Sequence, residues 1–355
     1  MLGSILSKID RTALEARGLF PHITERGRWR TTTDGYWTGG YWIGLLWSAY
    51  AATRREKYLR WAREWAVLLE PRKNDKNPDL GHLFYPSFVK GYKITGDEKM
   101  KKIALEAANT LTTCLNVSTG SLYNEIEVGR KKAGRAIIDF MTVLPLLWWA
   151  HGETGDERYL DAACRHSMST IENLVRNDGS TVHAVDFDLK TGRIIRKTTV
   201  QGHDENSCWS RGQAWGIYGF AEAYGGTEEK IFLSVAEKLA NYFVKNLPTD
   251  HVPYWDFNDP RIPDAPKDSS AAAIACSGLI TLSKLNGKRR FGDVADRILR
   301  SLSTNYMAEE DRDGILKHGC FHVPKKIGVD EGLIWGDYYF MEALMKSSGI
   351  LQMVG

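Results

Sequence analysis

The chain has 355 residues, 43% of them hydrophobic, so it can form one large folded domain with a substantial core, and we expect residues 1–355 to be that domain. The formal charge of +3 is small and the basic residues are scattered among acids, which argues against nucleic acid or an anionic membrane as the main partner. Five cysteines without a CxxC spacing indicate buried thiols in a reducing compartment, with no disulfide framework or zinc site.

The first 18 residues, MLGSILSKIDRTALEARG, have the periodicity of a helix. Lys8, Asp10 and Arg11 interrupt its apolar positions, whereas a signal peptide has an uninterrupted apolar core. No other run is long and apolar enough to span a bilayer. We therefore expect a cytoplasmic protein.

A short phrase recurs after successive apolar helical patterns: TRREKYLRWA from Thr53, TGDEKMKKIA from Thr95, TGDERYLDAA from Thr154, GTEEKIFLSVA from Gly226 and NGKRRFGDVA from Asn286. Glycine suits the end of one helix, and Thr, Asp or Asn suits the cap of the next. The phrases predict five helical hairpins, and the C-terminal DYYFMEALMKSS would complete a sixth with the N-terminal helix. We predict an all-α (α/α)6 toroid of inner apolar and outer amphipathic helices, with an open solenoid as the alternative.

The chemically rich segments lie at the starts of the predicted inner helices, at Thr31, Lys76, Gly134, Gln201 and Pro260. We expect these segments to meet at one end of the toroid and to form one site. Residues 177–199 alternate in polarity and contain a glycine in a turn, which predicts a small β-hairpin.

Two aspartates are candidates for acid–base chemistry. Asp139 lies in IIDFMTVLPLLWW between apolar neighbours, so we expect burial to raise the pKa of its carboxyl, as suits a general acid. The alternatives are a helix cap or a buried pair with Arg135. Asp79, in NPDLGH, suits a helix N-cap when taken alone, and with Asp139 it would supply the second carboxyl of an acid/base pair.

Cationic and aromatic side chains gather in the same segments. Arg211 suits bidentate binding of a ligand carboxylate, with a salt bridge to Asp204 or Glu205 as the alternative. His183 is a candidate hydrogen-bond partner of a substrate, although an isolated strand histidine is more often structural or exposed. Tryptophans beside glycine and polar residues offer flat faces for sugars unless they belong to the core, and they are Trp37, Trp42, Trp209, Trp215 and Trp255.

The nine histidines have no metal-binding spacing, and the sequence has no nucleotide, flavin or serine-hydrolase motif. We therefore expect neither a metal nor an organic cofactor.

Several strings together resemble one family of enzymes. They are DGYWTGGYW, PDLG, IIDFMTVLPLLWWA, HAVDFDLKTG, QGHDENSCWSRGQAWGIYGFA, VPYWDFNDP, IPDAPKDSSAAAIA and GVDEGLIWGDYYFMEAL. In this order, from about Thr31 to Lys346, they are similar to the unsaturated glucuronyl hydrolases of glycoside hydrolase family 88.

The resemblance implies an (α/α)6 barrel that removes the unsaturated uronic acid from oligosaccharides made by polysaccharide lyases, without a cofactor. It implies a catalytic role for Asp139, as general acid/base, and for Asp79. The implied substrate contacts are Trp37, His183, Gln201, Trp209, Arg211 and Trp215.

The chain departs from the family pattern at two places. Pro78 stands where the family has a histidine, so one hydrogen bond to substrate is either missing or supplied by His82. CFHVPKKI replaces a Ser/Lys-rich loop of members that favour sulfated substrates, so we expect unsulfated substrates to be preferred. Two alternatives remain, an unsaturated rhamnogalacturonyl hydrolase and a non-catalytic sugar-binding toroid.

Overall fold

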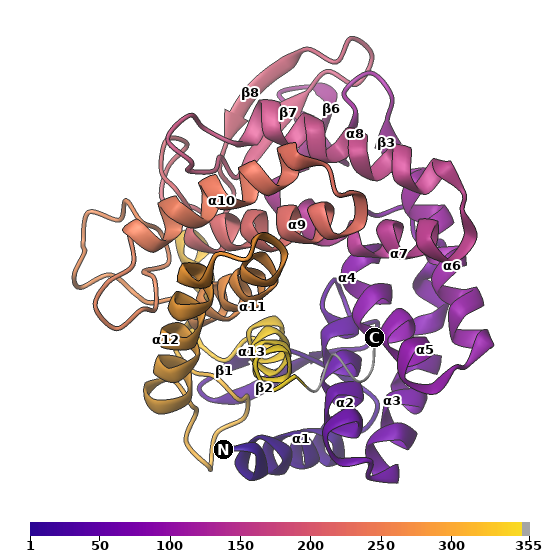
Figure 1. Cartoon of the computed structure of the whole chain (residues 1–355), viewed down its shortest axis with the longest axis vertical. Coiled ribbons are helices and arrows are strands. Elements are labelled where there is room, and N and C mark those ends of the chain that lie inside the picture. The colour runs from indigo at the N-terminus through magenta and orange to yellow at the C-terminus, as the bar shows by residue number, and fades with distance from the viewer. Residues whose placement is uncertain (350–355) are drawn as a thin grey trace.

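Helices alternate between an inner and an outer layer along the chain (Figure 1) in the computed structural model, which describes residues 1–349. The inner layer contains α2 (Gly39–Thr53), α4 (Leu80–Phe84) with α5 (Lys90–Thr95), α7 (Pro145–Thr154), α9 (Ser210–Thr227), α11 (Ser269–Asn286) and α13 (Ile334–Ser347). The outer layer contains α1 (Leu2–Ala16), α3 (Glu56–Leu69), α6 (Glu98–Thr112), α8 (Glu157–Leu174), α10 (Lys230–Lys245) and α12 (Arg289–Asn305). The last inner helix, α13, packs against the first, α2, so the ring closes and the predicted (α/α)6 toroid is confirmed.

The two layers follow from the distribution of apolar residues. The inner helix α11 is buried almost all round, from Ser269 to Leu282, whereas the outer helix α12 buries only one face. The recurring phrase turns the chain between layers as predicted at Gly96 and Gly155, which both have φ 69°. The next residue, Asp97 or Asp156, accepts a hydrogen bond from the backbone two positions on and so caps the outer helix.

The connections between helices contain short antiparallel strands. The two-stranded pairs are β1 (Phe20–Glu25) with β2 (Arg28–Thr32), β3 (Leu115–Asn116) with β4 (Ser121–Leu122), and β9 (Gly319–His322) with β10 (Ile327–Glu331). A four-stranded sheet has the order β5 (Asn124–Val128), β6 (Lys131–Ile137), β7 (Ala184–Phe187) and β8 (Ile194–Thr198). The hairpin predicted for residues 177–199 is confirmed as β7–β8, whereas its partners β5 and β6 were not predicted.

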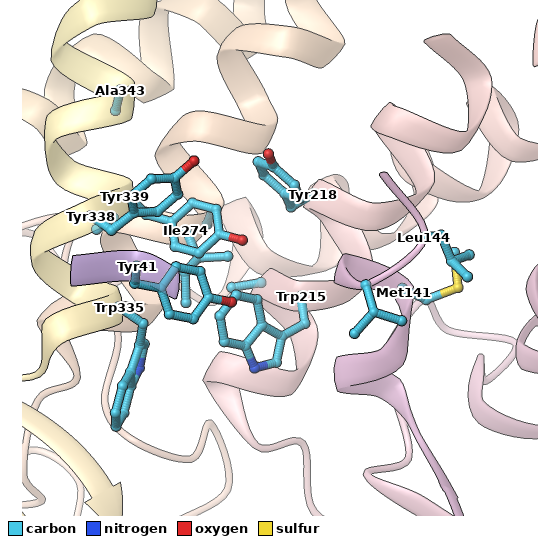
Figure 2. Packing of buried hydrophobic residues seen from close by; sticks show 14 of the residues in the cluster. Tyr41, Met141, Leu144, Trp215, Tyr218, Ile274, Trp335, Tyr338, Tyr339 and Ala343 are labelled. Atoms are coloured by element: carbon cyan, nitrogen blue, oxygen red, sulfur yellow. The ribbon is translucent and has the colours of Figure 1, made fainter. Parts of the chain in front are cut away.

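Aromatic side chains from different inner helices pack together at the centre of the ring. Figure 2 shows Tyr41 of α2 beside Trp215 of α9 and Trp335, Tyr338 and Tyr339 of α13. The ring centroids of Tyr41 and Tyr339 lie 5.7 Å apart, and those of Trp215 and Tyr339 lie 5.4 Å apart. These contacts fill the ring with protein, so a ligand must bind at one of its ends.

Four of the five candidate tryptophans belong to the buried core, namely Trp42, Trp209, Trp215 and Trp255, and two of them lie away from the candidate acids. Trp42 is buried and meets Trp65 edge to face at 5.7 Å. Trp255 is buried and donates its indole N–H to Asp259. Within residues 1–349, no helix is long and apolar enough to cross a membrane.

Candidate active site

Asp139 lies in a short 3₁₀ helix, η3 (Ile138–Thr142), that directly follows strand β6. The side chain is only 13% exposed, and its Oδ2 atom is buried without a hydrogen-bond partner in residues 1–349. Neither alternative for this residue holds, because Arg135 pairs with Asp186 at 2.7 Å and Asp139 does not cap a helix. A buried carboxyl oxygen without a partner is rare in folded proteins and marks a candidate functional group.

Burial is the main reason why the pKa of Asp139 rises, to about 7. The positive charge of Arg211 lowers the pKa, and the negative charge of Asp79 raises it further. The indole of Trp215 also faces this carboxyl and lowers its pKa, although its Nε1 atom does not reach hydrogen-bond geometry. A carboxyl with a pKa near neutrality can both give and recover a proton at physiological pH.

His183 approaches the same carboxyl in a defined tautomer. Its Nδ1 atom accepts hydrogen bonds from the backbone N–H groups of Val200 at 3.3 Å and Gln201 at 3.2 Å. Burial lowers the pKa of the imidazole to about 3, so the ring is neutral and carries its proton on Nε2. Nε2 lies 3.6 Å from Asp139 Oδ2, which directs an N–H donor at the unpaired oxygen.

Asp79 precedes α4, and its side chain is partly exposed. It occupies the N-cap position, but its carboxyl makes no capping hydrogen bond, so the simple capping interpretation is not supported. Burial raises the pKa of Asp79 to about 6, against smaller opposing effects of Asn77 and Arg72. Gly81 brings the two acid-bearing segments together, because a Cβ atom at this position would lie 2.3 Å from the backbone of Val143.

The protein engages both terminal nitrogens of Arg211. Its Nη1 donates to Asp268 at 2.7 Å and to the carbonyl of Cys320, and its Nη2 donates to Gln201 Oε1 and to the carbonyl of Phe321, both at 2.6 Å. The expected alternative of a salt bridge to Asp204 or Glu205 is therefore wrong, because Asp268 is the partner.

The hydrogen bond from Arg211 also orients the side chain of Gln201. Because a guanidinium can only donate, Oε1 of Gln201 must face Arg211 and its amide N–H₂ points away. No residue in the described part of the chain accepts from that amide, so it is a donor for a ligand. Binding of a ligand carboxylate by a terminal nitrogen of Arg211 would require one of these four contacts to be given up, whereas its Nε–H makes no hydrogen bond to the described residues.

Tryptophans border this group of polar side chains. Trp209 stacks on His183 with centroids 4.4 Å apart, and the guanidinium of Arg211 lies 4.4 Å from the Trp209 ring centre. Trp215 is buried and lies 6.0 Å from His82, which lies 5.5 Å from Trp37. The structure thus places all eight predicted site residues in one connected region.

The sequence alone did not reveal several neighbours of this region. Trp335 packs on Trp37 with centroids 4.9 Å apart, and His22 meets both rings. Tyr41 contacts His82 through its hydroxyl group. Asp268 was detectable, since KDSSAAA is a helix-capping sequence, but its ion pair with Arg211 joins residues far apart in the chain.

Comparisons with known proteins identify relatives of this chain. The model of Glycosyl Hydrolase Family 88 matches residues 10–349. An unsaturated glucuronyl hydrolase of Formosa agariphila is 38% identical over 322 residues, which cover 89% of this chain and 80% of that protein. An unsaturated chondroitin disaccharide hydrolase of Streptococcus pneumoniae is 36% identical over 327 residues, 88% of this chain and 81% of that protein.

A solved structure has the same architecture along nearly the whole chain. The crystal structure of the unsaturated glucuronyl hydrolase from Bacillus sp. GL1, which degrades glycosaminoglycan, superimposes with a TM-score of 0.92 at 33% identity. The match covers 97% of this chain and 95% of that one. With the family model and the close relatives, it establishes that this chain belongs to Glycosyl Hydrolase Family 88.

Proposed function

We propose that this protein is a hydrolase that removes the 4,5-unsaturated uronic acid from the non-reducing end of lyase-generated oligosaccharides. The observation that carries the proposal is the unpaired Asp139 Oδ2, held beside the N–H of His183 and near the charge of Asp79. The names of its relatives, glucuronyl and chondroitin disaccharide hydrolases, support the same class of substrate.

In the proposed reaction, Asp139 begins protonated and transfers its proton to carbon 4 of the sugar's double bond. The electron pair of the enol ether forms the new C–H bond and leaves a positive charge that the ring oxygen shares. Asp139, now ionised, takes a proton from water as the hydroxide adds to carbon 5. The resulting hemiketal opens and expels the neighbouring sugar, and the acid is restored.

The other residues have binding and orienting roles in this proposal. Asp79 as a carboxylate stabilises the developing positive charge and orients the ring. Trp37, Trp209 and Trp215 present aromatic faces and edges to the sugar. His183 and Gln201 each carry a fixed N–H donor for its oxygens.

An absorbance assay tests the proposal. Hydration destroys the conjugated double bond, so the near-ultraviolet absorbance of an unsaturated disaccharide should fall with time. Asp139→Asn should reduce turnover by roughly 10² to 10⁴ while substrate still binds. Asp337→Asn is a matched control, because burial also raises the pKa of Asp337 to about 7 but both of its carboxyl oxygens are occupied by backbone N–H groups.

The same assay separates the alternatives. A non-catalytic sugar-binding toroid would bind the disaccharide and leave the absorbance unchanged. A rhamnogalacturonyl hydrolase would act on unsaturated rhamnogalacturonan disaccharides and spare those from glycosaminoglycans.

We propose a preference for unsulfated disaccharides, because the loop from β9 to β10 lacks the Ser/Lys-rich pattern of members that favour sulfated substrates, although it exposes Lys325 and Lys326. Comparison of kcat/KM for unsulfated and sulfated substrates tests this preference. A higher value for sulfated substrates that Lys325→Ala or Lys326→Ala abolishes would overturn it.

We also propose that residues 1–355 act as one catalytic domain. In addition, we propose that the protein works in a reducing compartment such as the cytoplasm. Five free cysteines support that location, four of them buried. Labelling of thiols in the protein as extracted from its native cells, without added reductant, would test it.

A further inference from the structure

Tyr36 is the one strongly exposed Trp, Tyr or Phe side chain in residues 1–349, with 51% of its surface accessible. It lies immediately before Trp37, in the loop that leads into α2. The edge of its ring meets His22 with centroids 5.3 Å apart. An exposed aromatic side chain beside a group of sugar-binding candidates offers a flat face and a polar hydroxyl group to a ligand.

The backbone at Tyr36 is held in an unfavourable conformation. Its φ of 46° lies in the left-handed region, which disfavours a residue with a bulky side chain. The conformation is fixed from both sides, since the Tyr36 N–H donates to Asp34 at 2.9 Å and its carbonyl accepts from Arg72 at 2.5 Å. Strain that specific contacts maintain is typical of residues whose direction matters for function.

The same contacts tie Tyr36 to the segment that carries Asp79. Arg72 also donates to Asp75 at 2.5 Å, four residues before Asp79. Burial raises the pKa of Tyr36, and the negative charge of Asp79 raises it further. The positive charge of Arg72 opposes the effect of burial on the pKa of Asp79. Arg72 therefore links the loop of Tyr36 to the segment that leads to the second carboxyl of the site.

The different exposure of Asp139 and Tyr36 indicates how a bound oligosaccharide is oriented. The enzyme's proposed action removes a terminal sugar, so that sugar must lie at the inner end, near Asp139, whose side chain is 13% exposed. The rest of the oligosaccharide then extends toward solvent, where the exposed ring of Tyr36 is available.

We propose that Tyr36 is a specificity-determining residue that stacks on the sugar next to the unsaturated uronic acid, on the leaving-group side. The proposal rests on the proposed function. It implies that Tyr36 contributes to binding of disaccharides and longer substrates but not to the chemistry of the terminal sugar.

The test compares two substrates, an unsaturated uronyl disaccharide and the methyl glycoside of the same unsaturated uronic acid. Tyr36→Ala should raise KM for the disaccharide several-fold, because one aromatic contact is lost, with little change in kcat. It should leave kcat/KM for the methyl glycoside within about twofold of wild type. Tyr36→Phe keeps the ring and should behave like wild type with both substrates.

Tyr50→Ala is the matched control, because Tyr50 lies near the opposite end of α2. Equal losses with both substrates in Tyr36→Ala would overturn the proposal and would show that Tyr36 supports Asp79. Unchanged kinetics with the disaccharide would overturn it as well. If the wild-type protein turns over neither substrate, the proposed function fails, which is a separate result.

Discussion

Asp139 and Asp337 are both buried carboxyls whose pKa burial raises to about 7, yet their surroundings differ. Asp337 accepts backbone hydrogen bonds from Ile315 and Leu316, both at 2.8 Å, and so fixes a turn. Asp139 Oδ2 accepts none in the described residues. A raised pKa therefore does not single out a candidate catalytic acid, and it is the unused hydrogen-bonding capacity that favours Asp139 over Asp337.

Removal of the Asp139 charge should stabilise the protein in a pH-dependent way. The pKa is about 7 in the folded chain and about 3.9 in the unfolded chain, so between these values the folded chain holds one more proton. The free energy of unfolding of the wild type therefore falls as the pH rises from about 4 to about 7. Asp139→Asn has no titratable group at this position, so its free energy of unfolding does not fall in this way. Its advantage in stability over the wild type should grow over that pH range to at most about 4 kcal/mol.

Denaturant unfolding of both proteins at several pH values measures this difference. Asp79→Asn is an internal control, because its pKa of about 6 predicts a smaller advantage that levels off about one pH unit earlier. An advantage of Asp139→Asn that is the same at pH 4.5 and pH 8 would contradict the assigned burial effect.

The pH dependence of kcat/KM should be bell-shaped. Asp139 must be protonated to act as the acid, so activity falls as the pH rises above about 7. Asp79 must be ionised to stabilise positive charge, so activity also falls as the pH drops below about 6. Because the two carboxyls interact, the measured values belong to the pair. A profile that stays flat from pH 7 to pH 9 would exclude Asp139 as the proton donor.

At the residue scale, the sequence predicted what depends on near neighbours. The apolar setting of Asp139 is visible in IIDFM, and its raised pKa follows from that setting. The partner of Arg211 was mispredicted because Asp268 lies 57 positions away and meets it only through packing of α9 and α11. The tautomer of His183 likewise depends on the loop at Val200, which no local pattern specifies.

At the scale of elements, close backbone contacts decide where the acids lie. The short helix α4 carries Asp79 at its start, and Gly81 lets this helix touch the backbone at Val143, just after the 3₁₀ helix of Asp139. Gly40 of α2 is similar, since a Cβ atom there would lie 2.2 Å from the carbonyl oxygen of Leu83. Two glycines therefore set the position of α4 from both sides.

Gly81→Ala should separate the two acids. The new methyl group cannot fit 2.3 Å from the Val143 backbone, so α4 must shift, with a loss of about 1–3 kcal/mol in the free energy of unfolding. Because a displacement of about 1 Å can reduce turnover about 10²-fold, kcat should fall more than stability alone explains.

Gly152→Ala provides the comparison, because a Cβ atom at this helical position meets nothing within 4 Å. It should be neutral or stabilising and retain full kcat. Wild-type kcat in folded Gly81→Ala would show that the spacing of the two segments does not control the reaction.

At the scale of the whole molecule, the sequence predicted the ring because its helices have local signatures. Apolar inner helices and capped amphipathic outer helices repeat in order, and this pattern is readable without tertiary information. The small sheets were harder to predict, because β5 and β6 become strands through pairing with β7 and not through a strong pattern of their own.

The individual contacts that close the predicted ring are not visible in the sequence, because they join distant parts of the chain. Lys8 of α1 is buried and donates to the carbonyls of Glu309 at 2.7 Å and Arg312 at 2.8 Å. Glu331 accepts from Thr24 at 2.6 Å and from the backbone of Arg26 at 2.7 Å. The N-terminal 30 residues are thus joined to the segment before α13, and together they form one structural unit.

Lys8→Met tests whether that unit unfolds together. Methionine has a similar length but cannot donate, so two part-buried hydrogen bonds are lost, at about 0.5–1.5 kcal/mol each. Removal of a buried ammonium, whose pKa burial already lowers, partly offsets this loss. If residues 1–355 form one domain, calorimetry should show a single transition at a lower Tm, with activity lost at the same temperature. Leu14→Ala, on the exposed face of the same helix, should leave Tm nearly unchanged. A separate low-temperature transition in Lys8→Met that leaves activity intact would mean that α1 unfolds independently and that the catalytic ring is stable without it.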